Sequence, residues 1–227
     1  MGKGMQYFEK GLYSIAEASK LTGIDSSSVS RWLQGYHYKR SGKLRESPPV
    51  IVPDYEPVQG KPALSFLDLM ELRLVMRFRR HGLSFRKIRI ASERAAKIMN
   101  FSHPFASRKF MTDGKTILLQ IAHEEQDRDL LDLVKDQYAI EDILSPLLLD
   151  GIDFDGELPT RWSPAKGIVV DPRHGFGQPI VASCAIPSAT LFAAFKAEGS
   201  IEKVAKWYEV EPAAVQQAVD FESRAAA

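Results

Sequence analysis

Apolar residues recur at helical spacing in two short segments near the beginning of the chain. The positions that would face inward are Ile15, Ala18 and Leu21 in the first segment and Val29, Trp32 and Leu33 in the second. Gly23 lies between the segments, and glycine readily adopts the left-handed conformation that ends a helix. The pattern therefore predicts two helices joined by a tight turn, a helix-turn-helix.

Helix-capping residues lie where this pattern needs them. Ser14 and Glu17 have the spacing of a capping box, in which the hydroxyl and the carboxylate each accept a backbone N–H. Asp25 or Ser26 can cap the second helix, and Gly35 can end it. The outer face of that helix carries groups suited to base edges and phosphates in a DNA major groove. The candidate DNA contacts on this face are Ser27, Ser28, Ser30, Arg31 and Gln34.

A basic and aromatic run follows the second helix. The segment Tyr36–Arg40, together with Lys43 and Arg45, precedes the prolines of Ser47–Pro49 and the apolar run Val50–Val52. A hairpin beside the helix-turn-helix, called a wing, would explain this composition by placing cations on flanking phosphates. The candidate contacts from this run are Tyr36, His37, Lys39 and Arg40.

Two longer helices are predicted after the wing. Ser65 can cap a helix that is densely apolar from Phe66 to Phe78, which we expect to form the core of the first domain. Ser84 can cap a second helix with a basic outer face. Its candidate DNA contacts are Arg86, Lys87 and Arg89.

The middle of the chain is predicted to be a hairpin followed by a helix. Asp113 and Gly114 lie between two apolar segments, a pattern typical of a β-hairpin turn. The segment Leu130–Leu149 is predicted to be helical, with a break at Pro146.

The last third of the chain repeats the earlier pattern with acidic residues. Ile168–Val170 predicts a short strand, and a helix is expected between Pro187 and Gly199. A serine-capped helix, a brief turn and a proline-started helix then fill Ser200–Glu222, which is a second helix-turn-helix shape. Candidate residues for dimerisation or partner binding are Ile186, Leu191, Phe192, Phe195, Trp207 and Tyr208.

The predicted fold is mainly α with short β hairpins. Residues 1–110 would form a winged helix-turn-helix domain that binds DNA. Residues 111–160 would form a hairpin and helical connector. Residues 161–227 would form a small helical C-terminal domain, containing the second helix-turn-helix, for dimerisation or for binding a protein partner.

Charge is divided between the two parts of the chain. Residues 1–110 contain 20 Lys and Arg against 9 Asp and Glu, whereas residues 111–227 contain 10 against 20. A net charge of +11 in the first part indicates a polyanionic partner, and the helix-turn-helix in the same part makes double-stranded DNA the first choice.

Other chemistry is not indicated by the sequence. The single cysteine, Cys184, excludes an internal disulfide, and the scattered histidines do not predict a zinc site, so we expect no metal and no cofactor. The acidic turn Asp153–Glu157 lacks calcium-loop spacing, and Gly175–Gly177 lacks the Lys-Ser/Thr of a phosphate loop. Catalysis is not expected. Without a signal-peptide run or a bilayer-length apolar stretch, we expect a soluble, cytoplasmic protein without a membrane partner.

The first part of the chain resembles the MerR-type winged helix-turn-helix. The matching positions are Ile15, Glu17, Ala18, Leu21 and Gly23, and the later run HGLSFRKIRIA is similar to the second helical pair of that family.

The last part resembles a small domain of unknown function found in bacteria and archaea, often beside genes for PIN-like ribonucleases. The similarity lies in Ile168–Pro172, Gly177–Ile180, Gly199–Glu202 and the helices that follow. The two parts together look like the VapB-type antitoxins. This resemblance implies a homodimeric, DNA-binding antitoxin of a type II toxin-antitoxin system, which neutralises a PIN-like toxin and represses its own operon. The alternative is a stand-alone MerR-like transcriptional regulator whose C-terminal domain dimerises or senses a small molecule.

Overall fold

The computed structural model describes residues 9–149 and 151–224, and its helices and strands fall into two units. Among the described residues, the N-terminal unit comprises 12–149 and 154–159, and the C-terminal unit comprises 9–11, 151–153 and 160–224. The predicted fold class is confirmed in its coarse form, because the described residues are mainly helical with two small sheets.

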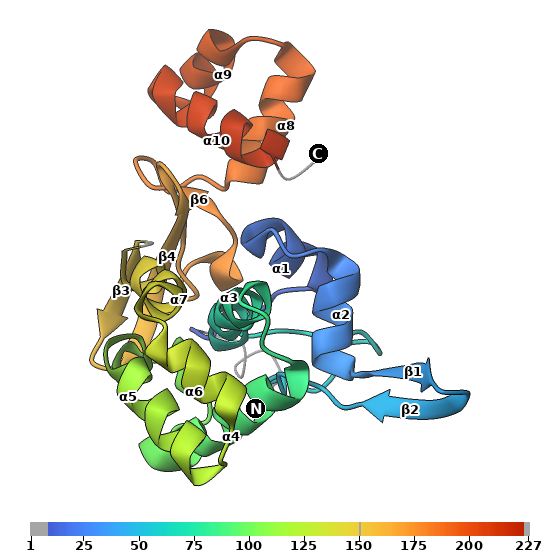
Figure 1. The fold of residues 1–227 in the computed structure, drawn as a ribbon. Helices are drawn as coiled ribbons and strands as arrows, with labels where there is room; N and C mark the ends of the chain where they lie inside the picture. Colours follow the sequence, from blue (N-terminus) through green and yellow to red (C-terminus); the bar gives the residue numbers. More distant parts are fainter. Residues whose placement is uncertain (1–8, 150, 225–227) are drawn as a thin grey trace, which may run out of the picture. The chain divides into compact units, whose positions relative to one another are not determined.

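The N-terminal unit begins with two short helices and a hairpin (Figure 1). The elements are α1 (Ile15–Thr22), α2 (Ser26–Gln34), β1 (Tyr36–Arg40) and β2 (Lys43–Ser47). The helices that follow are α3 (Phe66–Arg80), α4 (Phe85–Met99), the 3₁₀ turn η2 (Pro104–Ala106), α5 (Arg108–Glu124), α6 (Arg128–Lys135) and α7 (Gln137–Leu149). Backbone hydrogen bonds of 2.9 Å in both directions between Tyr13 and Leu64 tie the start of α1 to the start of α3.

Helix α3 supplies much of the core of this unit. Its apolar side chains are almost all buried, as the dense run in the sequence predicts. The ring of Phe78 lies 5.4 Å from that of Phe105 in η2, and Phe105 lies 4.9 Å from Phe110 in α5, measured between centroids. Burial of each such side chain stabilises the fold by about 1.5–3 kcal/mol. These aromatic contacts therefore join α3, η2 and α5 into one core.

The hairpin predicted at Asp113 and Gly114 is wrong. These residues lie inside helix α5, and Gly114 faces α7, where a Cβ would lie 3.2 Å from the methyl groups of Leu144. The glycine therefore allows two helices to approach closely and does not form a turn. Likewise, the expected helical break lies at Asp136, between α6 and α7, and not at Pro146, through which α7 continues.

The part of the chain after α7 contains short strands and a group of three helices (Figure 1). The strands β3 (Ile152–Asp155), β4 (Leu158–Ala165), β5 (Ile168–Val170) and β6 (Ile180–Val181) form a sheet in that order, and the turn η3 (Gly175–Gly177) precedes β6. The helices are α8 (Ser188–Glu198), α9 (Ile201–Tyr208) and α10 (Pro212–Arg224). Ser188 at the start of α8 donates a buried 2.6 Å hydrogen bond to Glu222 of α10, which fixes these two helices together.

None of the helices in the described part of the chain combines the length and the apolar composition needed to cross a bilayer.

Candidate nucleic-acid interface

The start of the N-terminal unit folds as the local sequence predicts. Ser14 and Glu17 form the capping box of α1, with the Glu17 carboxylate 2.8 Å from the backbone nitrogen of Ser14. Gly23 ends α1 in the left-handed conformation. Asp25 then caps α2 by accepting the backbone N–H of Ser28 at 2.9 Å. These local bonds set the turn between the two helices.

Helix α2 has a buried face and a polar face. Val29, Trp32 and Leu33 are buried, as the pattern predicts. The candidate DNA contacts lie on the other face, where Ser27, Arg31 and Gln34 are exposed and Ser28 and Ser30 are half-buried.

Arg31 lies along the outer face of α2 and reaches the hairpin. Its Nε donates to the Ser27 carbonyl at 3.2 Å, and its Nη2 donates to the Ser28 hydroxyl at 3.3 Å. Its guanidinium carbon is 6.0 Å from the centroid of the Tyr36 ring in β1. These are exposed contacts, which water or a ligand can replace at small net cost. The exposed face of α2 is therefore continuous with the hairpin.

Asp25 places a negative charge at the beginning of α2 at neutral pH. Hydrogen bonds from the Ser27 hydroxyl, and then from the Ser28 hydroxyl and backbone, lower the pKa of Asp25 to about 2. A charged cap is favourable here, because the helix dipole places partial positive charge at this end.

The hairpin is fixed at its base. Its strands pair in register from Tyr36 with Ser47 to Arg40 with Lys43. At Gly35, a Cβ would lie 2.6 Å from the Ser47 carbonyl oxygen, so only glycine allows this approach. The carbonyl of Trp32, at the end of α2, accepts the backbone N–H groups of Val50 at 2.7 Å and Ile51 at 3.2 Å.

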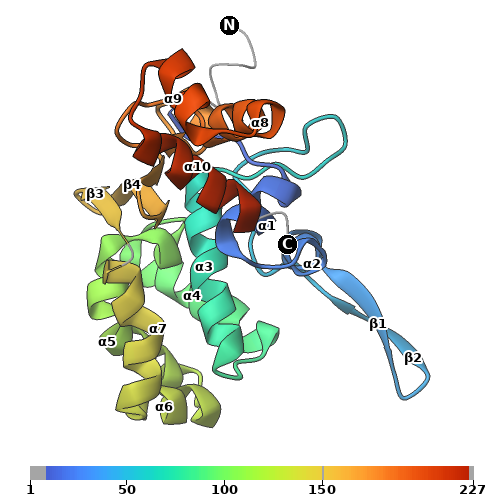
Figure 2. The same cartoon turned by 90° about the horizontal axis from the view of Figure 1, so that it is seen from above.

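Beyond this base, the hairpin extends away from the helices of its unit (Figure 2). Cross-strand partners share a face, so Tyr38 lies with Arg45, and Lys39 lies with Leu44 on the opposite face. All four side chains are exposed, and so is His37. Tyr36 is half-buried beside Tyr38 at a centroid distance of 5.8 Å. The side chain of Arg40 lies outside the part that the structure describes.

The start of α4 packs beside α2, because the Phe85 ring contacts Trp32 edge-on at 5.9 Å. Of the basic residues predicted as DNA contacts on α4, Arg86 is exposed, whereas Lys87 and Arg89 are half-buried. Arg89 donates to the Pro48 carbonyl at 2.9 Å and thereby supports the base of the hairpin.

Lys87 is engaged by two carboxylates. It forms ion pairs with Asp127, at 2.7 Å, and with Asp129. Burial acts to lower the pKa of Lys87, but the hydrogen bonds and charges of these aspartates outweigh it and raise the pKa. Its charge is therefore largely compensated within the protein, which the sequence did not indicate.

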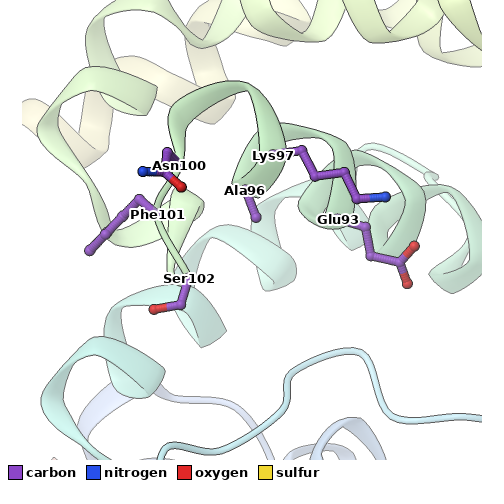
Figure 3. A pocket seen from close by; sticks show the side chains of 6 residues that line it. All are labelled: Glu93, Ala96, Lys97, Asn100, Phe101 and Ser102. Carbon is purple, nitrogen blue, oxygen red and sulfur yellow. The ribbon is translucent and has the colours of Figure 1, made fainter.

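Two other features of this unit could hold a small ligand or an ion. A shallow hollow of about 570 Å³ lies at the end of α4 (Figure 3), lined by Glu93, Ala96, Lys97, Asn100, Phe101 and Ser102. Separately, Asp54, Asp68 and His103 each bring one potential metal ligand to within 4.8 Å of the others. This second group is not evident in the sequence because its members are widely separated along the chain.

The candidate partner-binding residues of the C-terminal unit differ in exposure. Trp207 is 63% exposed and Tyr208 is 37% exposed, although both are large aromatic residues. Ile186, Phe192 and Phe195 are half-buried. The prediction of Leu191 as a partner contact is not supported, because its side chain is completely buried in the core of this unit.

Comparisons with known proteins cover both parts of the chain. Residues 11–92 match the family model described as "Putative DNA-binding HTH domain", and residues 168–221 match "Protein of unknown function (DUF433)". A curated protein of Mycobacterium tuberculosis, named "Putative antitoxin VapB45", is 26% identical over 94% of each chain. The crystal structure of Rv2018 from Mycobacterium tuberculosis covers 93% of this chain and 99% of its own, with a TM-score of 0.70 and 24% identity. The chain thus has the fold of Rv2018 and is similar, along nearly its whole length, to a protein named as an antitoxin.

Proposed function

We propose that the protein is the DNA-binding antitoxin of a type II toxin-antitoxin system, which neutralises a PIN-like ribonuclease and represses its own operon. The observation that carries this proposal is the exposed polar face of α2, continued by a basic hairpin, inside a region that matches a DNA-binding helix-turn-helix model. The similarity to the protein named as antitoxin VapB45 supports the second half of the proposal.

In this proposal α2 lies in the major groove. Arg31 is the main base-reading residue, since an arginine pairs with guanine through two donors. Gln34 and the serines around it contact neighbouring bases or phosphates. To bind DNA, Arg31 exchanges its weak bonds within the helix for bonds to the DNA. Breaking these exposed bonds reduces the affinity only slightly.

The hairpin acts as a wing that contacts the phosphate backbone. Lys39, Lys43 and Arg45 are exposed on it, and cations of this kind contribute affinity that is independent of sequence. Arg86 extends the basic surface from α4. Lys87 and Arg89 support the interface indirectly, because both already bind groups of the protein.

The C-terminal unit binds the toxin through the exposed aromatic pair on α9. Exposed tryptophan and tyrosine are enriched among the residues that dominate protein interfaces. The acidic balance of the second part of the chain suits a ribonuclease with a basic RNA-binding groove, and it would speed the encounter of the two proteins.

The decisive experiment compares two variants in two assays. The full chain is tested for binding to its own promoter and for inhibition of RNA cleavage by the ribonuclease encoded beside it. Arg31→Ala should lose promoter binding and retain inhibition, whereas Trp207→Ala should do the opposite. Promoter binding without capture of any neighbouring nuclease would instead favour a stand-alone regulator. Failure of the wild-type chain to bind duplex DNA at low salt would contradict the proposal altogether.

A further inference from the structure

Four ionisable side chains meet in the N-terminal unit, and three of them are buried. Asp54 comes from the segment after the hairpin, Asp68 and Glu71 from the first turns of α3, and His103 from the residue before η2. The side chains of Asp68, Glu71 and His103 are 0%, 6% and 5% exposed. Three acids and one histidine in such a position are unusual, because buried charges must be compensated.

The two carboxylates of α3 are each held on one side by the backbone. One oxygen of Asp68 accepts the N–H groups of Ser65 at 2.8 Å and Asp54 at 3.1 Å. One oxygen of Glu71 accepts the N–H of Phe105 at 3.2 Å. Their other oxygens, Asp68 Oδ1 and Glu71 Oε2, both lie 3.8 Å from Nδ1 of His103.

Two of these atoms have no hydrogen-bond partner within the described residues. They are Asp68 Oδ1 and His103 Nδ1, which face each other in the interior. The opposite ring nitrogen, His103 Nε2, lies 2.9 Å from Asp54 Oδ1. A histidine that binds a metal characteristically donates its second N–H to a carboxylate in this way, which fixes the ring and increases its basicity.

We propose that Asp68, Glu71 and His103 bind one divalent transition-metal ion of the zinc class, with Asp54 orienting the histidine ring. The facing donors are one nitrogen and two carboxylate oxygens, the ligand types that Zn²⁺ accepts at about 2.0–2.2 Å. Each carboxylate oxygen lies 3.8 Å from Nδ1 of His103, a separation that two ligands of one ion can have. The ion would supply the partner that the two unpaired atoms need.

Protonation of His103 is the alternative to metal binding at this site. Burial acts to lower the pKa of His103, but the hydrogen bond with Asp54 and the negative charges of Glu71 and Asp54 raise it to about 10 in the absence of a metal. A buried imidazolium would satisfy part of the negative charge. It would leave Nδ1 at 3.8 Å from both acceptors, which is too long for a hydrogen bond.

The site would also brace the hairpin. Asp54 follows Val50 and Ile51, whose N–H groups bind the Trp32 carbonyl at the end of α2. An ion that holds the Asp54 segment against α3 therefore stabilises the support of the proposed DNA interface. This consequence for DNA binding rests on the proposed function, whereas metal binding itself does not.

The test uses the full, untagged chain, stripped with a chelator and titrated with zinc alone by calorimetry and thermal shift. We expect one ion per chain and a raised melting temperature. Asp68→Asn and His103→Gln should abolish both effects, and the partly exposed Asp54→Asn should weaken affinity by about 10–100-fold. The control is His123→Gln on the exposed face of α5, which should bind zinc as the wild type does.

Two results would overturn the metal site. One is a stripped wild-type chain that takes up no zinc, and the other is a zinc affinity that remains unchanged in both Asp68→Asn and His103→Gln. If either of these variants does not fold, Asp54→Asn decides, since unchanged affinity in that variant also counts against the site. Zinc binding by a chain that ignores DNA would leave the site intact and reject only the proposed function.

Discussion

Arg31 is the residue on which the proposed sequence preference depends most. It is exposed on α2, and only weak bonds to the preceding turn and a contact with Tyr36 hold it. We expect Arg31→Ala to weaken operator binding by about 1–3 kcal/mol and to relax preference at one base position. Fluorescence anisotropy at fixed salt, with operator variants, measures both effects.

The matched control for Arg31 is Lys115→Ala, which removes one exposed cation from α5. It should change affinity little. Equal losses from both variants would mean that charge alone, and not the position of Arg31, determines binding.

Ser27 sets the charge state of the α2 cap. Its hydroxyl is the largest cause of the low pKa of Asp25, so Ser27→Ala should raise that pKa from about 2 towards the ordinary value of 3.8. A lowered carboxylate pKa contributes stability that is present above the unfolded pKa and is lost as the pH falls through the folded pKa. The stability gap between wild type and Ser27→Ala should therefore be constant near neutral pH and shrink below about pH 4.

Urea denaturation at a series of pH values tests this, with an NMR titration of the Asp25 carboxyl as a direct check. An identical midpoint for Asp25 in both proteins would show that Ser27 does not stabilise the charged form.

At the level of elements, the junction between α2 and the hairpin depends on Gly35. Its φ of 72° and ψ of −177° belong to a region that is essentially limited to glycine, and a side chain would strike the Ser47 carbonyl. Gly23 has a similar φ of 70° with open space around it, so Gly23→Ala carries only the left-handed penalty of about 1–2 kcal/mol.

We therefore expect Gly35→Ala to reduce the free energy of unfolding by about 1–3 kcal/mol more than Gly23→Ala does. Denaturant unfolding of the two variants gives the difference. If both cost the same, the close approach to Ser47 is relieved by a small backbone shift.

The hairpin should contribute affinity without sequence preference. Removing a phosphate contact lowers the slope of log affinity against log salt by about 0.9. The double variant Lys39→Ala/Arg45→Ala should lower it by up to about 1.8, and the single variants would identify which face of the hairpin contacts DNA, since the two residues lie on opposite faces. A double variant with the wild-type slope would rule out a wing.

Those elements that follow from local bonds were predictable from the sequence. The caps at Ser14, Ser65 and Ser84 and the glycine stop at Gly23 form with neighbours a few residues away, and the structure confirms them. Helix α5 was not predictable in the same way, because the reason for Gly114 is Leu144, a residue of α7.

In the candidate site, too, the features that depend on neighbouring residues were predictable and those that depend on distant residues were not. The polar face of α2 follows from the periodicity of a single helix. The pairing of Lys87 with Asp127 and Asp129, and the burial of Leu191, depend on partners far along the chain. The same is true of the cluster at His103, whose members come from three separate segments.

At the scale of the whole molecule, we expect a homodimer. One helix of nine residues offers few base contacts, and dimers that place two such helices on DNA bind half-sites about 34–36 Å apart. Sedimentation at micromolar concentration should give about twice the chain mass of 25.4 kDa. A monomer at that concentration, with full operator affinity, would exclude this arrangement.

The carbonyl of Trp32 has a consequence for the operators that this protein can use. Because it joins the end of α2 to the segment that follows the hairpin, the two elements that we propose to contact DNA should move as one rigid unit. If the groove width of a promoter does not fit this fixed arrangement of α2 and the hairpin, the DNA must deform to be bound. The affinity for different promoters should therefore depend on how easily each duplex bends, even at base pairs that no side chain contacts.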